Sequence, residues 1–104
     1  MAQFDVYRNP NRKTNKIIPY LIDLQADLLN DFATRSVAPL ILASDFGKIV
    51  RILNPQFEIE GKKIVMSTAE LAGISARNLG EKIGNLNKHR HTILAAIDFL
   101  FTGF

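Results

Sequence analysis

The residues of this chain that could carry out chemistry are two histidines and a few aspartates, and there is no cysteine. His89 and His91 stand two positions apart, so on a helix their side chains would point about 200° from each other, away from any shared metal ion. The sequence also lacks an HExxH motif and offers no cysteine thiolate for zinc. We therefore expect neither a bound metal nor a cofactor.

Three aspartates, Asp23, Asp27 and Asp31, supply carboxylates of the kind used in general acid–base catalysis. They lie in a segment that favours strand and loop, where a spacing of four does not bring side chains together. Each is expected to be a turn or edge residue. The scattered glycines form neither a GxxxxGK[ST] nor a GxGxxG phosphate-binding turn. The sequence thus contains no recognisable catalytic set, and we expect a protein that is not an enzyme.

An apolar run with three aromatic residues occupies positions 99–104, the last six of the sequence. The last residues of most proteins are polar and poorly ordered. A helix serving only its own core would show a single apolar stripe. Phe99 lies off the stripe that helical spacing gives to Ile93, Ile97, Leu100, Phe101 and Phe104. This second apolar face predicts a partner.

Two further features of the sequence have two possible interpretations each. Asp98 stands among the apolar residues of the last helical turns, either on an exposed helix face or as a polar anchor beside an aromatic contact surface. Leu28 and Leu29 are flanked by Asp27 and by Asn30, which places them on a loop. They either tuck under the sheet and anchor the loop, or stay exposed for a function.

The elements that must position these residues are mostly strands. Alternation predicts a strand over residues 3–7 and a second over 17–25, with Pro19 near its start or on an edge. Residues 34–42 predict a third strand, in which Pro39 requires a bulge or an edge position. Residues 48–53 fit either a strand or a short helix.

The second half of the chain predicts a hairpin and a helix. Residues 57–59 and 62–66 pair around a turn in which Gly61 permits positive φ. A short strand is expected near 74–79. A helix is expected from the N-cap Asn87 to about Thr102, with Gly103 ending it. The fold class is a mainly β domain closed by one C-terminal helix.

Length and composition favour one domain over residues 1–104, with 47% hydrophobic and 22% charged residues. No apolar run approaches the roughly 20 residues that cross a bilayer. The first residues lack the features of a signal peptide, and we expect an intracellular, cytoplasmic protein without membrane contact. The net charge is +3, with basic clusters over residues 8–16 and 88–91 that are either solvated or in contact with an acidic partner or phosphate.

Four segments in order resemble the CcdB toxins of plasmid and chromosomal toxin–antitoxin modules. They are Gln-Phe-Asp-Val-Tyr at 3–7, Asp-Leu-Gln-Ala-Asp-Leu-Leu at 23–29, Arg-Ser-Val-Ala-Pro-Leu at 35–40, and Ala-Ile-Asp-Phe-Leu-Phe-Thr-Gly-Phe at 96–104. The resemblance spans essentially the whole chain. It implies an SH3-like small β-barrel with a C-terminal α-helix, related to the MazF toxins, that forms a homodimer.

The resemblance also implies a function without catalysis and with a role in plasmid maintenance. Such toxins bind the A subunit of DNA gyrase and trap its cleaved-DNA complex, and a CcdA-type antitoxin neutralises them. DNA is then reached only through gyrase or the antitoxin complex. The positions matching the gyrase-contact motif are Leu28, Leu29, Asp98, Phe101, Thr102, Gly103 and Phe104.

Three positions depart from the family pattern. Thr102 replaces a tryptophan, Phe104 replaces an isoleucine, and Asp98 replaces an asparagine. An indole is the kind of rigid contact that often forms a binding hot spot, so its loss predicts weaker binding unless Phe99 or Phe104 restores the contact area.

The alternative function is that of a MazF-like endoribonuclease. Thr34 and Arg35, followed by Pro39, loosely resemble the strand of those toxins that bears a catalytic arginine. A guanidinium can hold a phosphate bidentately. No partner acid or base stands beside Arg35 in the sequence, so the competing interpretation is an arginine paired with a carboxylate at the barrel surface.

Overall fold

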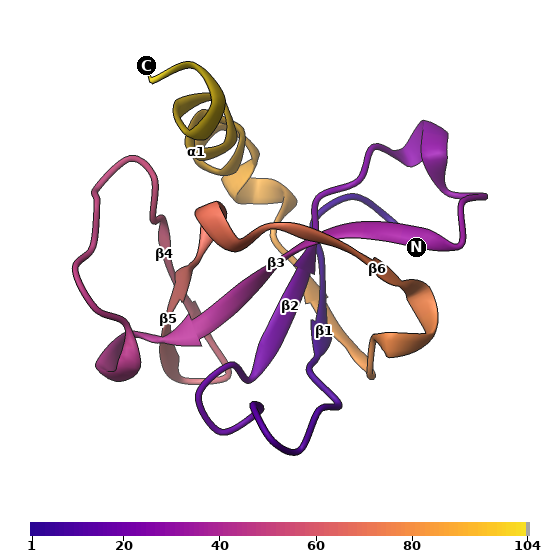
Figure 1. Ribbon diagram of the computed structural model, residues 1–104, viewed down its shortest axis with the longest axis horizontal. Helices are drawn as coiled ribbons and strands as arrows, with labels where there is room; N and C mark the ends of the chain where they lie inside the picture. The colour runs from indigo at the N-terminus through magenta and orange to yellow at the C-terminus, as the bar shows by residue number, and fades with distance from the viewer. Residues whose placement is uncertain (104) are drawn as a thin grey trace.

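The computed structural model describes residues 1–103, which form one curled antiparallel sheet and a C-terminal helix (Figure 1). The strand order is β4-β5-β3-β2-β1-β7, and β6 pairs with the free half of β3. The strands are β1 Asp5–Arg8, β2 Tyr20–Asp23, β3 Thr34–Leu42, β4 Gln56–Ile59, β5 Lys62–Met66, β6 Ala72–Ser75 and β7 Lys82–Asn85. The sheet curls into a half-barrel, which confirms the predicted mainly β class with one C-terminal helix.

The core lies between the concave face of the sheet and the start of the helix. The members of its apolar cluster occupy alternate positions along β2, β3 and β5, as the period of two requires. From the helix, α1 (Arg90–Thr102), Ile93 and Ala96 complete the cluster. The main apolar members are Phe4, Val6, Tyr20, Ile22, Ala38, Leu40, Phe57, Ile64, Met66, Leu86, Ile93 and Ala96.

Pro39 lies in the central strand, so the predicted edge or bulge position is wrong. β3 pairs with β2 along one side without a register shift. On its other side, β3 pairs with β6 up to Val37 and with β5 from Leu40, so Pro39 falls between the two partners. The Pro39 carbonyl accepts a hydrogen bond from Ser67 N on that side. Because the N and O of a strand residue point the same way, the missing N–H faces the gap where no strand needs it.

The hairpin of β4 and β5 is confirmed. Its turn residues Glu60 and Gly61 both have positive φ, 52° and 77°, as a type I′ turn requires. Residues 48–53 form neither of the two predicted elements and run as turns. The strand expected near 74–79 begins and ends earlier, as β6, and is followed by the 3₁₀ turn η4 (Ala76–Asn78).

Strand β7 was not predicted, because Gly84 and two polar residues hide its alternation. It pairs with β1, and Gly80 just before it donates its N–H to Arg8 O at 2.9 Å. A Cβ on Gly80 would lie 2.6 Å from that oxygen. Gly80 is therefore required for the close approach of the two segments.

The helix ends as predicted but begins differently. Gly103 has φ 80° and donates its N–H to Phe99 O, the left-handed cap expected of a terminating glycine. Asn87 does not act as an N-cap and instead lies in the 3₁₀ turn η5 (Asn87–His89) that leads into the helix. Within residues 1–103, no helix is long and apolar enough to cross a membrane.

Candidate functional site

The two leucines flagged by the sequence lie on an exposed turn. The 3₁₀ turn η1 (Asp27–Leu29) contains no buried residue. Leu28 is 97% exposed and Leu29 is 41% exposed, so the interpretation that both tuck under the sheet is wrong. Phe32, a few residues on, is 60% exposed. We refer to residues 27–32 as the Leu28 loop, which displays three large apolar side chains to solvent.

Buried polar side chains of neighbouring residues hold this loop through hydrogen bonds. Arg35 on β3 donates from Nε and Nη2 to Asp23 Oδ2 at 3.0 and 2.6 Å, and both side chains are completely buried. Arg35 Nη1 lies 3.5 Å from Leu29 O, and Gln25 Nε2 donates to the same carbonyl at 2.9 Å. The loop is therefore tied to β2 and β3 through its main chain, while its leucines remain outside.

This arrangement corrects two predictions. Asp23 is a fully buried residue of a central strand and not a turn or edge residue. Arg35 is paired with a carboxylate, as the competing interpretation held, but in the interior and not at the surface. With its donors directed to Asp23, Leu29 and Asn30, the guanidinium is inaccessible to an RNA phosphate. Asp27 and Asp31 are exposed, and Asp27 Oδ1 accepts from Gln3 N.

The end of α1, residues 98–103, carries the second set of predicted contact residues. Phe101 is 70% exposed, and Asp98, Thr102 and Gly103 are exposed as well. Thr102 Oγ1 donates to Asp98 O at 2.7 Å, a bond within the helix. Phe104, the last residue of the predicted site, lies outside the described residues.

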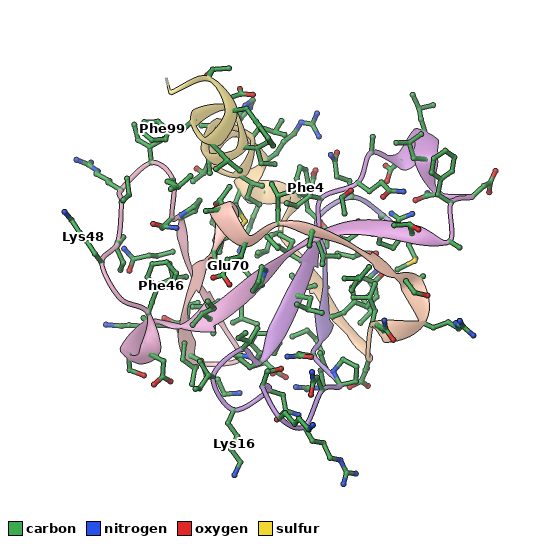
Figure 2. The ribbon with its side chains drawn as sticks, viewed as in Figure 1. Phe4, Lys16, Phe46, Lys48, Glu70 and Phe99 are labelled. Carbon is green, nitrogen blue, oxygen red and sulfur yellow. The ribbon has the colours of Figure 1, made fainter. Side chains whose placement is uncertain are left out.

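The two apolar faces of the helix differ from the sequence prediction. Phe101, placed on the core stripe by its spacing, is largely exposed, whereas Phe99, placed off it, is half-buried. Figure 2 shows Phe99 on the side of α1 that faces residues 46–54, and the side chains of Ile52 and Ala95 line a depression between that segment and the helix. The helix end therefore presents Phe101 as its main apolar group.

One chain does not bring the two groups together. In Figure 1 the Leu28 loop and the end of α1 both project beyond the same end of the half-barrel, at separate places. The single chain thus displays two apolar surfaces that face a common side. A third exposed apolar group, which the ambiguous 48–53 pattern concealed, comprises Ile49, Val50 and Ile52, exposed by 36 to 50%. Phe32 was also missed, since a lone aromatic among polar residues gives no periodic signal.

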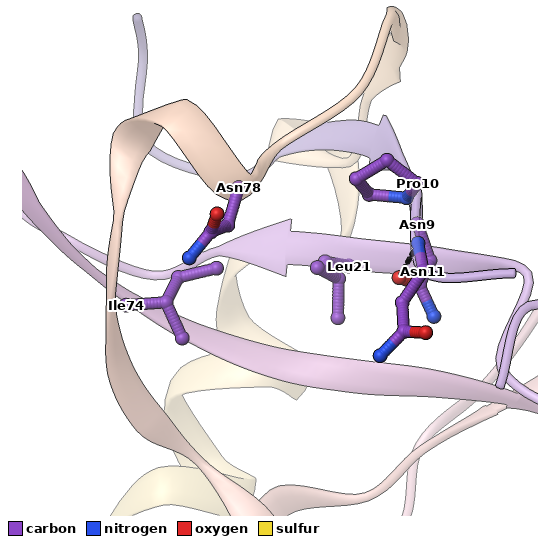
Figure 3. Close-up of a pocket in the computed structure, with 6 residues that line it drawn as sticks. All are labelled: Asn9, Pro10, Asn11, Leu21, Ile74 and Asn78. Atoms are coloured by element: carbon purple, nitrogen blue, oxygen red, sulfur yellow. Dashed lines mark hydrogen bonds between the residues drawn. The ribbon is translucent and has the colours of Figure 1, made fainter. Parts of the chain in front are cut away.

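One depression of the described surface, of about 490 Å³, is lined by three asparagines and by apolar side chains (Figure 3). Asn9, its most buried asparagine, already donates to Thr14 Oγ1 and Ile18 O. No group there titrates near neutral pH. Over residues 1–103, no cluster of three potential metal ligands occurs either.

The strongly shifted titratable groups belong to ion-pair networks of the sheet. Burial and the neighbouring Asp5 raise the pKa of Tyr7 to about 12. Hydrogen bonds from Arg8 and Tyr20 lower the pKa of Glu60, and Arg8 joins Glu60 to Glu81. These networks link strands and turns of the sheet and include none of the exposed apolar side chains.

The chain matches a protein-family model. The model described as "CcdB protein" matches residues 3–103 of the 104-residue chain. The match includes the Leu28 loop and the end of α1 up to Gly103. Coverage of nearly the whole chain shows that this protein is a member of the CcdB family, the toxins of toxin–antitoxin systems.

Proposed function

We propose that this toxin binds the A subunit of DNA gyrase and traps the gyrase complex that holds cleaved DNA. The observation that carries the proposal is the pair of exposed apolar surfaces, the Leu28 loop and the end of α1, at one end of the half-barrel. Soluble proteins rarely keep such side chains in water without a binding partner. The positions are also those that match the gyrase-contact motif of the family.

The mechanism needs no chemistry from the toxin. Binding one state of an enzyme more tightly than another shifts its population toward the bound state. A toxin that wedges between opened gyrase subunits would hold the cleaved state in this way. We therefore propose that the protein is not an enzyme, acts in the cytoplasm where gyrase works, and contacts DNA only through gyrase or the antitoxin complex.

We infer that the active form is a homodimer. A two-fold toxin would present the Leu28 loop and the helix end twice to a two-fold target. The third apolar group, Ile49, Val50 and Ile52, gives each chain a further surface that association would cover. A CcdA-type antitoxin would neutralise the dimer by covering its target surface, since a disordered chain can wrap such a surface. In a plasmid-borne module this pairing serves plasmid maintenance.

The assay that tests the proposal uses supercoiled DNA, gyrase and ATP. The wild-type protein should convert the DNA to linear, cleaved product in the presence of gyrase and leave it intact alone. Leu28→Ser should reduce cleavage strongly, whereas Ile17→Ser, which alters an equally apolar residue that is 50% exposed on another loop, should not.

RNA incubated with the protein alone is the contrasting arm. Cleavage of RNA without gyrase, together with DNA that stays intact in the presence of gyrase, would overturn the proposal and restore the ribonuclease alternative.

Co-expression with a CcdA-type antitoxin should abolish growth inhibition by the wild-type protein. Inhibition that persists at full antitoxin expression would contradict the proposed neutralisation.

A further inference from the structure

No apolar side chain of the Leu28 loop is buried in the core, where packing would fix the shape of the loop. Its 3₁₀ turn contains no buried side chain, and Leu28 is almost completely exposed. An apolar residue in water gains by folding back onto the nearest apolar surface. A loop that keeps Leu28 extended must therefore be held by its main chain.

The main-chain anchor is the carbonyl oxygen of Leu29. It accepts hydrogen bonds from Gln25 Nε2 at 2.9 Å, from Phe32 N at 3.1 Å and from Arg35 Nη1 at 3.5 Å. Arg35 Nη2 also reaches Asn30 Oδ1 at 3.2 Å. Two buried side chains thus bind the main chain and a side chain of the loop at consecutive residues.

These two side chains are themselves fixed by the sheet. Gln25 Oε1 accepts from Ser36 N at 3.0 Å, which spans the ends of β2 and β3. Arg35 is locked by Asp23, whose other oxygen, Oδ1, accepts from Gln25 N at 3.0 Å. Every donor and acceptor of this cluster that is buried has a partner in the described chain.

Stability alone does not account for such a cluster. Burying an arginine and a carboxylate removes both from water, and apolar residues of the same volume are often as stable or more so. What apolar residues cannot supply is a directed bond to a loop carbonyl.

We propose that Arg35 and Gln25 are positioning residues that hold the Leu28 loop in the conformation that binds the target. The proposal rests on the proposed function, in which Leu28 contacts gyrase. Neither side chain can touch a partner, because Arg35 is completely buried and Gln25 is 7% exposed. Changing either side chain can therefore affect binding only indirectly, by altering the loop or the stability of the fold.

Gln25→Met is the main test variant, because it keeps the volume of the side chain and removes both of its hydrogen bonds. Arg35→Lys is the second, since an ammonium can still pair with Asp23 but lacks the planar fork that reaches Leu29 and Asn30 at once. Ile64→Val on β5 is the control, as it disturbs a fully buried residue remote from the loop.

Two measurements are made on each variant. Backbone ¹⁵N relaxation of the toxin alone gives the order parameter S² of residues 28–30. A fall of S² from about 0.85 to below about 0.6 marks a released loop. Calorimetry with the gyrase A subunit reports affinity. We expect both test variants to release the loop and to lose about tenfold or more in affinity, and the control to do neither.

The proposal is overturned if the loop keeps its order in Gln25→Met and Arg35→Lys, or if the loop is released without loss of affinity. It is also overturned if Ile64→Val has the same effects, because a general loss of stability would then explain them. Failure of the wild-type protein to bind the A subunit would instead refute the proposed function. The relaxation data would still decide, independently, whether the network holds the loop.

Discussion

At the scale of single residues, the buried carboxylates have structural and not binding roles. Asp5 illustrates the structural kind. It is buried and accepts hydrogen bonds from Asn85, Ala2 N and Tyr7, and Lys82 lies 3.2 Å away. Burial raises the pKa of Asp5, but the hydrogen bonds and the lysine together lower it by more than burial raises it. The net shift of the pKa is therefore downward.

The lowered pKa of Asp5 predicts a dependence of stability on pH. A carboxyl whose pKa is lower in the folded state stabilises the fold above its unfolded pKa of about 4, and this stabilisation is lost as the pH falls through the folded value. Asp5→Asn should therefore be less stable than the wild type at pH 7 and should lose less stability between pH 5 and pH 2. Thermal unfolding across this range measures it. Parallel curves for the two proteins would contradict the assignment.

Thr102 is the residue at which this chain departs most from its family. Its hydroxyl bonds back to Asp98 O and its side chain is exposed, so a larger group would extend from the helix without displacing the core. Thr102→Trp should tighten binding to the gyrase A subunit about tenfold, because an indole adds rigid contact area at small entropic cost. Titration calorimetry beside Thr102→Ala provides the comparison. Weaker binding by the tryptophan variant would show that another aromatic already fills the site.

At the scale of elements, much of the fold followed from local signals. Gly61 predicts the β4–β5 hairpin because glycine allows the positive φ that its turn needs, and Gly103 predicts the helix end for the same reason. The central position of Pro39 and the Asp23–Arg35 pair could not be read from the sequence. Both depend on which strands flank β3, a long-range property that neither spacing nor propensity encodes.

The contact between β1 and the start of β7 gives a sharp test of the sheet. Gly80→Ala would place a Cβ 2.6 Å from Arg8 O, which is backbone and cannot move aside, so the variant should lose about 1–3 kcal/mol of stability. Gly84→Ala, on β7 itself and with no atom within 4 Å of the added Cβ, is the matched control. Urea unfolding measures both. Equal stability of the two variants would contradict the described packing.

At the scale of the whole molecule, the structure shows the exposure of three predicted contact residues, whereas their role in binding stays a prediction. Leu28, Leu29 and Phe101 are exposed as a contact surface requires, and the family match covers them. The sequence did not show that a buried network supports the loop, since Gln25, Asp23 and Arg35 look like ordinary polar residues until their partners are known. Exposed Phe32 and the apolar group at 49–52 were likewise invisible.

The exposed apolar groups predict association of two chains. A single chain leaves Ile49, Val50 and Ile52 partly in water beside the depression that faces α1. Light scattering at micromolar concentration should give twice the 11.7 kDa of one chain, and Ile52→Asp should lower the mass toward that of the monomer. A monomeric wild-type protein would remove the two-fold arrangement from the mechanism.

The measurement that tests the central claim most directly is the affinity of the gyrase A subunit for the wild-type protein, Leu28→Ser and Ile17→Ser. If the Leu28 loop is a target surface, calorimetry should show binding by the wild type, a loss of about 30-fold for Leu28→Ser, which is about 2 kcal/mol, and no change for Ile17→Ser. Thermal unfolding should be the same for all three, because both leucine and isoleucine are exposed. Equal affinities for the two variants, or no binding by the wild type, would contradict the account.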